Sequence, residues 1–251
     1  MYKNTEYCTS FPIIFMHNTS KDVLFLIPMP ISEIDVNWSI PLNVINQISK
    51  IQCFIVENSK VSRHFLKKIN PNIVWDNIVI FEMDKHQIQS QNKEILHILQ
   101  QHHCVGLMSD AGLPCIADPG NHVVRIAHEN GIQVRPLTGP SSIILALIAS
   151  GLNGQSFKFH GYLPSKPEER KKSIIALEKI CKETTQLFIE APYRNHAMIS
   201  DLIQTLNSET KLLIASDICG DNEFILCKSV KWWRENPIEL GKIPCMFAIG
   251  V

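Results

Sequence analysis

The sequence predicts an α/β protein of two domains, with a mostly parallel sheet in the first domain and a mixed sheet in the second. In the first part of the chain, short apolar runs of strand length alternate with segments whose apolar residues recur at helical spacing. Such alternation is typical of a parallel sheet with helices on its faces. Near the end of the chain, apolar runs follow one another with little helix between them, which favours a mixed sheet.

The expected strands are short, as is usual for buried strands. In the first domain they span residues 23–27, 53–56, 78–81, 105–108 and 132–134. In the second domain they span residues 157–159, 186–189, 212–215, 223–227 and 245–249. The clearest helix of the second domain has apolar side chains along one face, namely Ile199, Leu202, Ile203 and Leu206.

The chain of 251 residues is long enough for two small domains. A short glycine-rich segment, residues 151–155, is the natural hinge between them. We therefore expect a first domain at residues 21–152 and a second domain at residues 153–251. Residues 1–20 form an extension whose role the sequence does not define, and their apolar stretch lacks the features of a secretory signal.

The composition is that of an ordinary globular protein, with 24 basic (Lys and Arg) and 24 acidic residues and 45% hydrophobic residues. The longest strongly apolar run, residues 143–149, is too short to span a membrane, and we expect it to form a helix buried on all sides. None of the eight cysteines belongs to a Cys-x-x-Cys pair. Buried free thiols in a reducing cytoplasm explain them more simply than metal binding, so we expect no metal site.

The most informative residues lie in two loops, each of which directly follows an apolar run. Residues 109–120 read Ser-Asp-Ala-Gly-Leu-Pro-Cys-Ile-Ala-Asp-Pro-Gly, and residues 138–142 read Thr-Gly-Pro-Ser-Ser. In an open α/β sheet, ligands bind outside the carboxyl ends of the strands, where these loops are expected. The sequence has neither Gly-x-Gly-x-x-Gly nor Gly-Lys-Ser/Thr, which argues against a dinucleotide fingerprint and a P-loop.

Both loops contain residues that begin helices. We expect Asp118 to be the N-cap of a helix whose first residue is Pro119, and the Gly-Pro pair at 139–140 to begin the next helix in the same way. Gly131 and Gly151 should end these two helices, since glycine readily adopts the left-handed conformation of a helix end. The free N–H groups at two such helix starts suit a carboxylate or a phosphate.

Four motifs occur in a specific order. The loop at 109–120 and the Gly-Pro-Ser helix start are followed by Phe-His-Gly-Tyr-Leu-Pro at 159–164 and Ile-Glu-Ala-Pro-Tyr-Arg at 189–194. In these motifs and their order, the chain resembles the tetrapyrrole methylase superfamily over residues 22–250, and within it the ribosomal RNA small subunit methyltransferase I branch. The resemblance implies a methyltransferase that binds S-adenosylmethionine in a cleft between two α/β domains.

The resemblance also implies an acceptor, an assembly and a compartment. Members of the branch methylate the 2′-hydroxyl of a cytidine in 16S ribosomal RNA, so ribosomal RNA or the small ribosomal subunit is the expected partner. A homodimer, as in relatives, and a cytoplasmic location are expected too. The alternative enzyme is a C-methyltransferase of tetrapyrrole or corrin precursors, since relatives elsewhere in the superfamily methylate ring carbons of such molecules. A degenerate, non-catalytic paralogue that binds the cofactor or the ribosome is the third alternative.

Departures from the branch keep the non-catalytic alternative open. The branch has a Thr-Pro-Ile-Gly-Asn-type loop after its first strand, but residues 27–33 read Ile-Pro-Met-Pro-Ile-Ser-Glu, without the glycine and the asparagine. The branch motif Glu-Asp-Thr-Arg becomes Glu-Asn-Ser-Lys at 57–60, and further changes occur at 215–218 and 242–245. The cofactor half matches better than the rest, which fits a shared cofactor with an altered or weakened acceptor.

A methyl donor with a carboxylate, an ammonium group, a ribose and an adenine needs backbone donors, polar acceptors and apolar walls. The residues expected to supply these from the first-domain loops are Pro28, Ser109, Asp110, Ala111, Gly112, Pro114, Ile116, Ser141 and Ser142. The resemblance adds three residues on the second-domain side of the cleft, namely Glu190, Tyr193 and Ala215.

A ribose hydroxyl is a weak nucleophile, so a general base would help the reaction. The candidates are Asp110, Asp118 and Glu57, because they are carboxylates at expected strand or loop ends. We favour helix capping as the role of Asp118. For Glu57, a hydrogen bond within its loop and a role on the side of the methyl acceptor are equally favoured. Asp110 leans towards function, but the sequence alone assigns no catalytic residue.

An RNA-binding protein is expected to present basic side chains, because phosphate contacts dominate the affinity. Neither domain has a marked excess of basic residues, but two local clusters occur. One lies on an expected helix and contains Lys60, Arg63, His64, Lys67 and Lys68. The other follows the motif at 159–164 and contains Lys166, Arg170, Lys171 and Lys172. A solvated helix face is the alternative use of either cluster.

Overall fold

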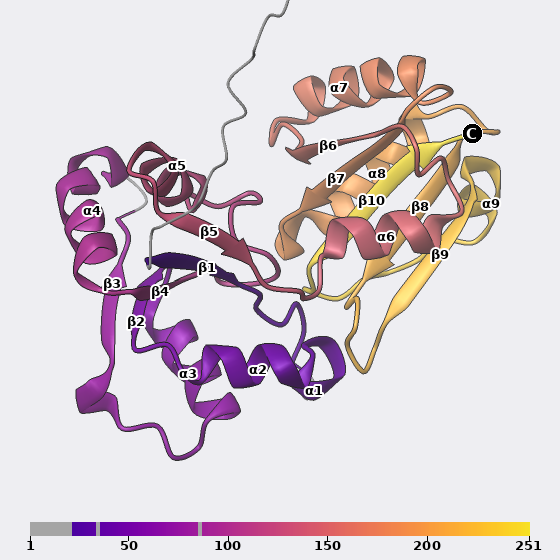
Figure 1. Cartoon of the computed structure of the whole chain (residues 1–251). Helices are drawn as coiled ribbons and strands as arrows, with labels where there is room; N and C mark the ends of the chain where they lie inside the picture. Colours follow the sequence, from indigo (N-terminus) through magenta and orange to yellow (C-terminus); the bar gives the residue numbers. More distant parts are fainter. Residues whose placement is uncertain (1–21, 34–35, 85–86) are drawn as a thin grey trace, which may run out of the picture.

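A computed structural model of the chain describes residues 22–33, 36–84 and 87–251. These residues form two five-stranded sheets, which lie side by side in Figure 1 with helices on their faces. The extension predicted at residues 1–20 lies outside the described residues.

The first sheet is entirely parallel. Its strands are β1 (Val23–Ile27), β2 (Cys53–Val56), β3 (Val79–Glu82), β4 (Cys104–Met108) and β5 (Gln133–Pro136). They are arranged in the order β3-β2-β4-β1-β5. The predicted parallel sheet is confirmed, with strand bounds that differ from the expected ones by no more than two residues. Because all strands run in one direction, the loops that follow β1, β2, β4 and β5 leave the same edge of the sheet.

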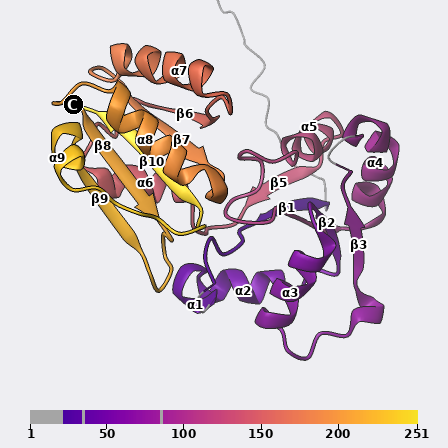
Figure 2. The ribbon, with the colours of Figure 1, turned by 180° about the vertical axis from the view of Figure 1, so that it is seen from behind.

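Helices cover both faces of this sheet (Figure 1 and Figure 2). On one face lie α1 (Val36–Ser39), α2 (Leu42–Ile48) and α3 (Ser59–Ile69). On the other face lie α4 (Asn92–Gln101) and α5 (Asn121–Glu129). Successive side chains of a strand point to opposite faces, so Phe54 packs with the first group of helices and Ile55 with the second. Two short 3-10 helices, η1 (Trp75–Asn77) and η2 (Ile88–Gln91), precede β3 and α4.

The second sheet is mixed, as predicted. Its strands are β6 (Phe157–Tyr162), β7 (Thr185–Glu190), β8 (Lys211–Ser216), β9 (Phe224–Ser229) and β10 (Cys245–Gly250). They are arranged in the order β6-β7-β10-β8-β9, where β6 and β7 pair in parallel and the other neighbours pair antiparallel. Residues 217–223 join β8 to β9, a connection short enough for antiparallel neighbours without a crossover helix.

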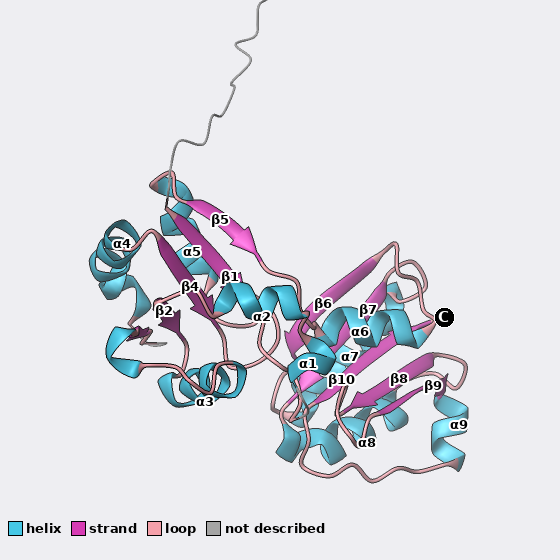
Figure 3. Cartoon of the chain, turned by 60° about the horizontal axis from the view of Figure 1, so that its bottom comes forward, coloured by secondary structure: helices cyan, strands magenta, loops and turns pink. Residues whose placement is uncertain are grey.

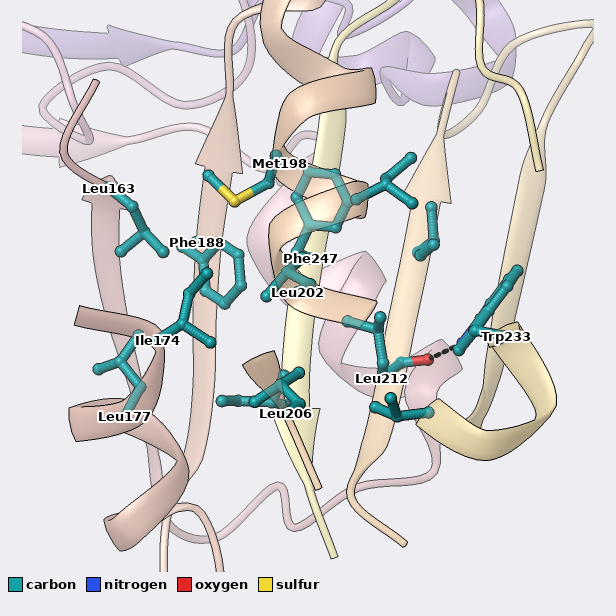
Figure 4. Close-up of a cluster of buried hydrophobic side chains, with 14 of the residues drawn as sticks. Leu163, Ile174, Leu177, Phe188, Met198, Leu202, Leu206, Leu212, Trp233 and Phe247 are labelled. Atoms are coloured by element: carbon teal, nitrogen blue, oxygen red, sulfur yellow. Dashed lines mark hydrogen bonds between the residues drawn. The ribbon is translucent and has the colours of Figure 1, made fainter. Parts of the chain in front are cut away.

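One face of the second sheet is covered by α7 (Pro167–Ile180), α8 (Asn195–Thr205), which follows the 3-10 helix η3 (Pro192–Arg194), and α9 (Val230–Glu235). Figure 4 shows the buried side chains between these helices and the strands. The rings of Phe188 and Phe247 stack with their centroids 5.7 Å apart. The indole N–H of Trp233 donates to the carbonyl oxygen of Leu212 at 2.9 Å, so the polar atom of this buried ring is satisfied.

The opposite face of the second sheet is covered by α6 (Ser142–Ser150), which contacts β8, β9 and β10 (Figure 3). The prediction of a helix buried on all sides is wrong. Ala146 and Leu147 are buried against the sheet, but 70% of Ile148 and 45% of Ile144 are exposed, since no other element that the structure describes covers the outer side of this helix. Among the described residues, no helix is long and apolar enough to cross a membrane.

The boundary predicted at residue 152 stays a prediction. On its N-terminal side, α6 packs against the second sheet, where Ala146 and Leu147 share a buried cluster with Leu187, Leu213, Ala215, Ile218, Met246 and Ala248. The chain therefore crosses from one sheet to the other between β5 and α6, before the glycine-rich segment.

The helix ends follow the prediction, and the helix starts do not. Gly131 and Gly151 follow α5 and α6 with φ of 70°, the left-handed conformation that glycine favours. The Asp118 cap is wrong, because α5 begins at Asn121 and its N-cap residue, Gly120, has no side-chain cap. The start predicted at the Gly-Pro pair is also displaced, since Ser141 is the N-cap of α6 and its hydroxyl accepts from the N–H of Ile144 at 3.5 Å.

Candidate active site

A cleft of about 310 Å³ lies where the strand-end loops of the first sheet meet β6 and β7 of the second. Most of the residues predicted from the sequence line this cleft, namely Glu57, Ser109, Asp110, Ala111, Gly112, Ile116, Asp118, Ser141 and Ser142. The structure thus brings the two predicted motif loops together at one site.

The second sheet contributes side chains that the sequence reasoning did not propose as site residues. Phe159, Tyr162 and Ile189 line the cleft, together with Pro244 before β10 and Ile31 after β1. The first three belong to motifs that carry the family resemblance, and this was the signal that could have identified them. Pro244 and Ile31 lie in segments that depart from the branch pattern, so no motif pointed to them.

The Asp118 carboxylate organises the loop between β4 and α5. Its Oδ1 accepts from the N–H groups of Cys115 at 3.0 Å and Gly120 at 2.7 Å, and its Oδ2 accepts from the N–H of Ile116 at 3.1 Å. Cys115 and Ala117 have φ of 75° and 63°, a conformation that is costly for residues other than glycine. Asp118 therefore holds a strained loop in place, which is a structural role different from the predicted helix cap.

Burial raises the pKa of the Asp118 carboxyl, and the negative charge of Glu57 adds to the rise, while the backbone N–H donors oppose it. Burial also raises the pKa of the neighbouring Cys115 thiol to about 12, with a further contribution from the Asp118 charge. Cys115 is therefore a neutral thiol at physiological pH, and the loop contains no thiolate nucleophile at this position.

Glu57 joins the ends of two neighbouring strands. Its Oε2 accepts from the backbone N–H of Asp110 at 2.9 Å, and its own N–H donates to the carbonyl oxygen of Met108 at 3.1 Å. Of the two interpretations that the sequence left open for Glu57, the structure contains the loop hydrogen bond. The side chains of Glu57 and Asp110 both line the cleft.

Two glycines let the loops approach one another closely. Gly112 has φ of 68°, and its backbone exchanges hydrogen bonds with Met29 at 2.8 and 3.1 Å, which fixes the loop after β1 to the loop after β4. At Gly139, a Cβ atom would lie 2.1 Å from the Cβ of Pro28, so only glycine fits there. Pro28 thus packs against Gly139 and does not line the cleft.

The N-terminus of α6 opens into the cleft, which Ser141, Ser142 and Ile143 line. The helix dipole places partial positive charge at this end, where free N–H groups favour a carboxylate or a phosphate. Ser141 also caps the helix, so one residue both shapes the helix start and faces the cleft.

A second cavity of about 220 Å³ continues the cleft along the second sheet, because the two share Ile31, Ser142, Tyr162, Ile189 and Pro244. Glu190 lines this cavity and is 3% exposed. Its Oε1 accepts from the N–H of Ala191 at 2.7 Å and from Nε and Nη2 of Arg194 at 2.8 and 2.6 Å. Its Oε2 is buried without a hydrogen-bond partner among the described residues, which leaves a strong acceptor for a ligand.

Carboxylates dominate the charge of these two cavities. Glu57, Asp110 and Asp118 line the cleft, and Glu190 and Asp217 line its continuation. Among the lining residues that the structure describes, neither cavity has a lysine, an arginine or a histidine. Such a site favours a ligand with positive charge or hydrogen-bond donors over a polyanion.

Three further predicted residues do not line either cavity. Pro114 is buried within its loop, and Ala215 is fully buried beneath α6 in the core of the second sheet. Tyr193 is 76% exposed, and its ring lies 5.7 Å from the guanidinium of Arg194. These residues surround the site without facing it.

The second basic cluster is partly used inside the protein. Arg170 is 3% exposed, and its Nε donates to Asp201 of α8 at 2.7 Å while Nη1 donates to the carbonyl oxygen of Ser165 at 2.9 Å. Lys171 lies 3.7 Å from the same aspartate. The interpretation of Arg170 as an RNA-facing residue is therefore wrong, because Asp201, far along the sequence, neutralises it in the core.

In the part of the chain that the structure describes, no group of three or more His, Cys, Asp and Glu residues is placed to hold a metal ion.

A cleft between two α/β halves, with a helix N-terminus that suits an anion and carboxylates that suit a cation, fits a small zwitterionic ligand. The model of the family Tetrapyrrole (Corrin/Porphyrin) Methylases matches residues 37–230. The chain belongs to the tetrapyrrole methylase family, and it is an S-adenosylmethionine-dependent methyltransferase, as its motifs implied.

Two relatives and one solved structure illustrate what the chain is similar to. Ribosomal RNA small subunit methyltransferase I of Vibrio cholerae is 28% identical over 218 residues, which cover 85% of this chain and 72% of that protein. The protein of the same name from Micromonospora olivasterospora is 31% identical over 202 residues, 80% of this chain and 61% of that protein. Uroporphyrin-III C-methyl transferase from Thermus thermophilus, solved with S-adenosylhomocysteine, has the same fold at a TM-score of 0.52, with 14% identity and coverage of 91% and 97%.

Proposed function

We propose that this enzyme transfers a methyl group from S-adenosylmethionine to the 2′-hydroxyl of a cytidine in 16S ribosomal RNA. The observation that carries the proposal is the cleft that combines both motif loops with β6 and β7, in a chain whose relatives are named ribosomal RNA small subunit methyltransferase I. The finer assignment, to a cytidine and to its ribose oxygen, rests on the motif resemblance to that branch.

The residues of the site fit S-adenosylmethionine. The N–H groups at the start of α6 suit its carboxylate, and the cleft carboxylates suit its ammonium and sulfonium charges. The unpartnered Oε2 of Glu190 would accept from one of its N–H or O–H groups, and Ile31, Ile116 and Ile189 provide apolar walls. When bound, this cofactor supplies a methyl group that its positively charged sulfur already activates.

The protein then has to align the acceptor hydroxyl, exclude water and take up one proton. The acceptor oxygen would displace sulfur from the methyl carbon, with S-adenosylhomocysteine as the leaving group, and a nearby carboxylate would take up the hydroxyl proton. Asp118 uses both oxygens to hold three backbone N–H groups, and Glu57 holds the N–H of Asp110. We favour Asp110 as the candidate base because of its position, since it lines both the cleft and the groove beside α3.

A tetrapyrrole or corrin precursor is the less favoured acceptor. Such molecules carry several carboxylate side chains, which need cationic partners in a binding site. The cleft and its continuation instead present carboxylates, such as Asp110, Glu190 and Asp217, with no cationic side chain among the described lining residues. A nucleoside that enters the cleft brings a neutral base and sugar, and its phosphates can stay outside.

The proposal includes a homodimer in the cytoplasm, which the resemblance supports. A second copy would cover apolar surface that is exposed on the outer side of α6, where Ile144 and Ile148 lie. Burial of such surface is favourable by about 25 cal/mol per Å². A cytoplasmic location places the enzyme with its ribosomal substrate.

The testing experiment has two stages. Calorimetric titration with S-adenosylmethionine and S-adenosylhomocysteine measures cofactor binding, and transfer of a labelled methyl group to small subunits that lack the modification measures the reaction. Nucleoside analysis of the RNA should then contain labelled 2′-O-methylcytidine. Binding without transfer to RNA would support another acceptor or the non-catalytic alternative, and absence of binding would contradict the proposed function altogether.

A further inference from the structure

Helix α3 concentrates positive charge in a chain that has equal numbers of basic and acidic residues. Its eleven residues include Lys60, Arg63, Lys67 and Lys68, together with His64, and no aspartate or glutamate. All five of these side chains are exposed. This helix is therefore a strongly basic surface element in an otherwise balanced protein.

Three of these residues form a line along the helix. Lys60, His64 and Lys68 are spaced by four positions, so their side chains lie on one face, and we call them the α3 stripe. The stripe extends over about 12 Å, from eight residues at 1.5 Å each. Two further cations of α3 lie off this line: the guanidinium of Arg63 lies 4.9 Å from the ring of Trp75, and Nζ of Lys67 donates to the carbonyl oxygen of Pro71 at 2.5 Å.

The α3 stripe borders a groove that leads to the active-site cleft. His64 and Lys68 line a groove of about 610 Å³, and Ile31 and Asp110 line both this groove and the cleft. Glu33 is the other acidic residue at the groove. The groove is thus a continuous path from the basic helix to the residue that we favour as the base.

Lys60 lies in the first turn of α3, where a cation opposes the helix dipole. At the same end of the helix, the carboxylate of Glu82 accepts from the N–H of Ser59 at 2.9 Å. The cations of the stripe are exposed to solvent, where an external polyanion can reach them.

We propose that the α3 stripe and its groove hold the phosphate backbone of the RNA beside the nucleotide that enters the cleft. This inference rests on the proposed function, and it adds where the acceptor strand lies. It divides the site electrostatically: basic side chains on α3 contact phosphates, while the acidic cleft receives an uncharged nucleoside and the cationic cofactor.

The test compares two double variants of equal charge change. Lys60→Glu with Lys68→Glu reverses the stripe, and Lys93→Glu with Arg125→Glu reverses two exposed cations on α4 and α5, on the opposite face of the same sheet. Filter binding to unmodified small-subunit RNA, transcribed in vitro, is measured over a series of salt concentrations, alongside calorimetric binding of S-adenosylmethionine.

We expect the stripe variant to bind the RNA about tenfold more weakly at moderate salt, with the slope of log affinity against log salt reduced by about one for each lysine that contacts a phosphate. The control variant should match the wild type, and both should bind the cofactor as the wild type does. Equal RNA affinity and salt slope in the two variants would overturn the inference. Stripe-dependent RNA binding by an enzyme that transfers no methyl group to RNA would uphold the inference and refute the proposed methylation.

Discussion

The Glu57 carboxylate accepts the backbone N–H of Asp110 at 2.9 Å, across 53 positions of sequence. The two residues follow the neighbouring strands β2 and β4, which pair in parallel. This bond therefore fixes the position at which Asp110 enters the cleft, and it makes Glu57 a positioning residue for its neighbour.

Replacing Glu57 separates this positioning role from a role as the base. Glu57→Gln keeps a carbonyl oxygen that can accept from Asp110, so we expect near-normal cofactor affinity and measurable methyl transfer. Glu57→Ala removes the acceptor, and we expect cofactor affinity to fall about tenfold, since a hydrogen bond to a charged group is worth about 1.5–3 kcal/mol. Calorimetry and labelled methyl transfer measure the two effects. Normal affinity with no transfer in Glu57→Gln would instead assign the base to Glu57.

Removal of the Asp118 carboxylate should destabilise the fold. Asp118→Ala leaves three backbone N–H groups of a strained loop without their acceptor, so we expect the free energy of unfolding to fall by about 2–4 kcal/mol. Denaturant unfolding followed by circular dichroism measures the change. Asp76→Ala, at an exposed aspartate on η1, is the control and should have little effect. Equal stability of the two variants would contradict the organising role of Asp118.

The thiol of Cys115 should resist alkylation at neutral pH. Burial raises its pKa to about 12, so the thiolate fraction at pH 8 is about 10⁻⁴. Reaction with iodoacetamide should become faster as the pH rises towards that value, because only the thiolate reacts. Peptide mass spectrometry can compare Cys115 with Cys104, which is exposed. Modification of Cys115 as fast as Cys104 at pH 8 would contradict the raised pKa.

The outer face of α6 can be tested through the oligomeric state. Ile148→Asp places a charge in the surface that a second copy is proposed to bury, so we expect a dimer to dissociate into monomers. Ile175→Asp is the matched control, since Ile175 is also an exposed isoleucine, on α7. Sedimentation velocity distinguishes the outcomes. A wild type that sediments as a monomer would refute the homodimer, and a dimer unaffected by Ile148→Asp would move the interface to another surface.

The sequence predicted the parts of the structure that depend on local pattern. Apolar runs placed every strand, because each run is bounded by polar or glycine-rich residues, and the two glycines after α5 and α6 marked the helix ends correctly. The motif loops also pointed to the residues that line the cleft, such as Asp110 and Ser141.

Features that depend on loop geometry or on distant partners could not be predicted in the same way. Asp118 precedes a helix and resembles a cap, but it folds back to the N–H groups of Cys115 and Ile116, which only the loop geometry reveals. Arg170 looks like one more surface cation until Asp201 of α8 pairs with it. The uniformly apolar α6 has no periodicity from which an exposed side could be recognised.

The position of α6 decides where the protein can be divided. This helix precedes the glycine-rich segment in sequence, yet it shields Leu213, Met246 and Ala248 of the second sheet from water. A fragment that starts at residue 153 would leave one broad side of that sheet bare and prone to aggregate. A fragment that starts at residue 138 would keep α6 over this side of the sheet. The part of the chain that packs as one unit therefore begins before the glycine-rich segment.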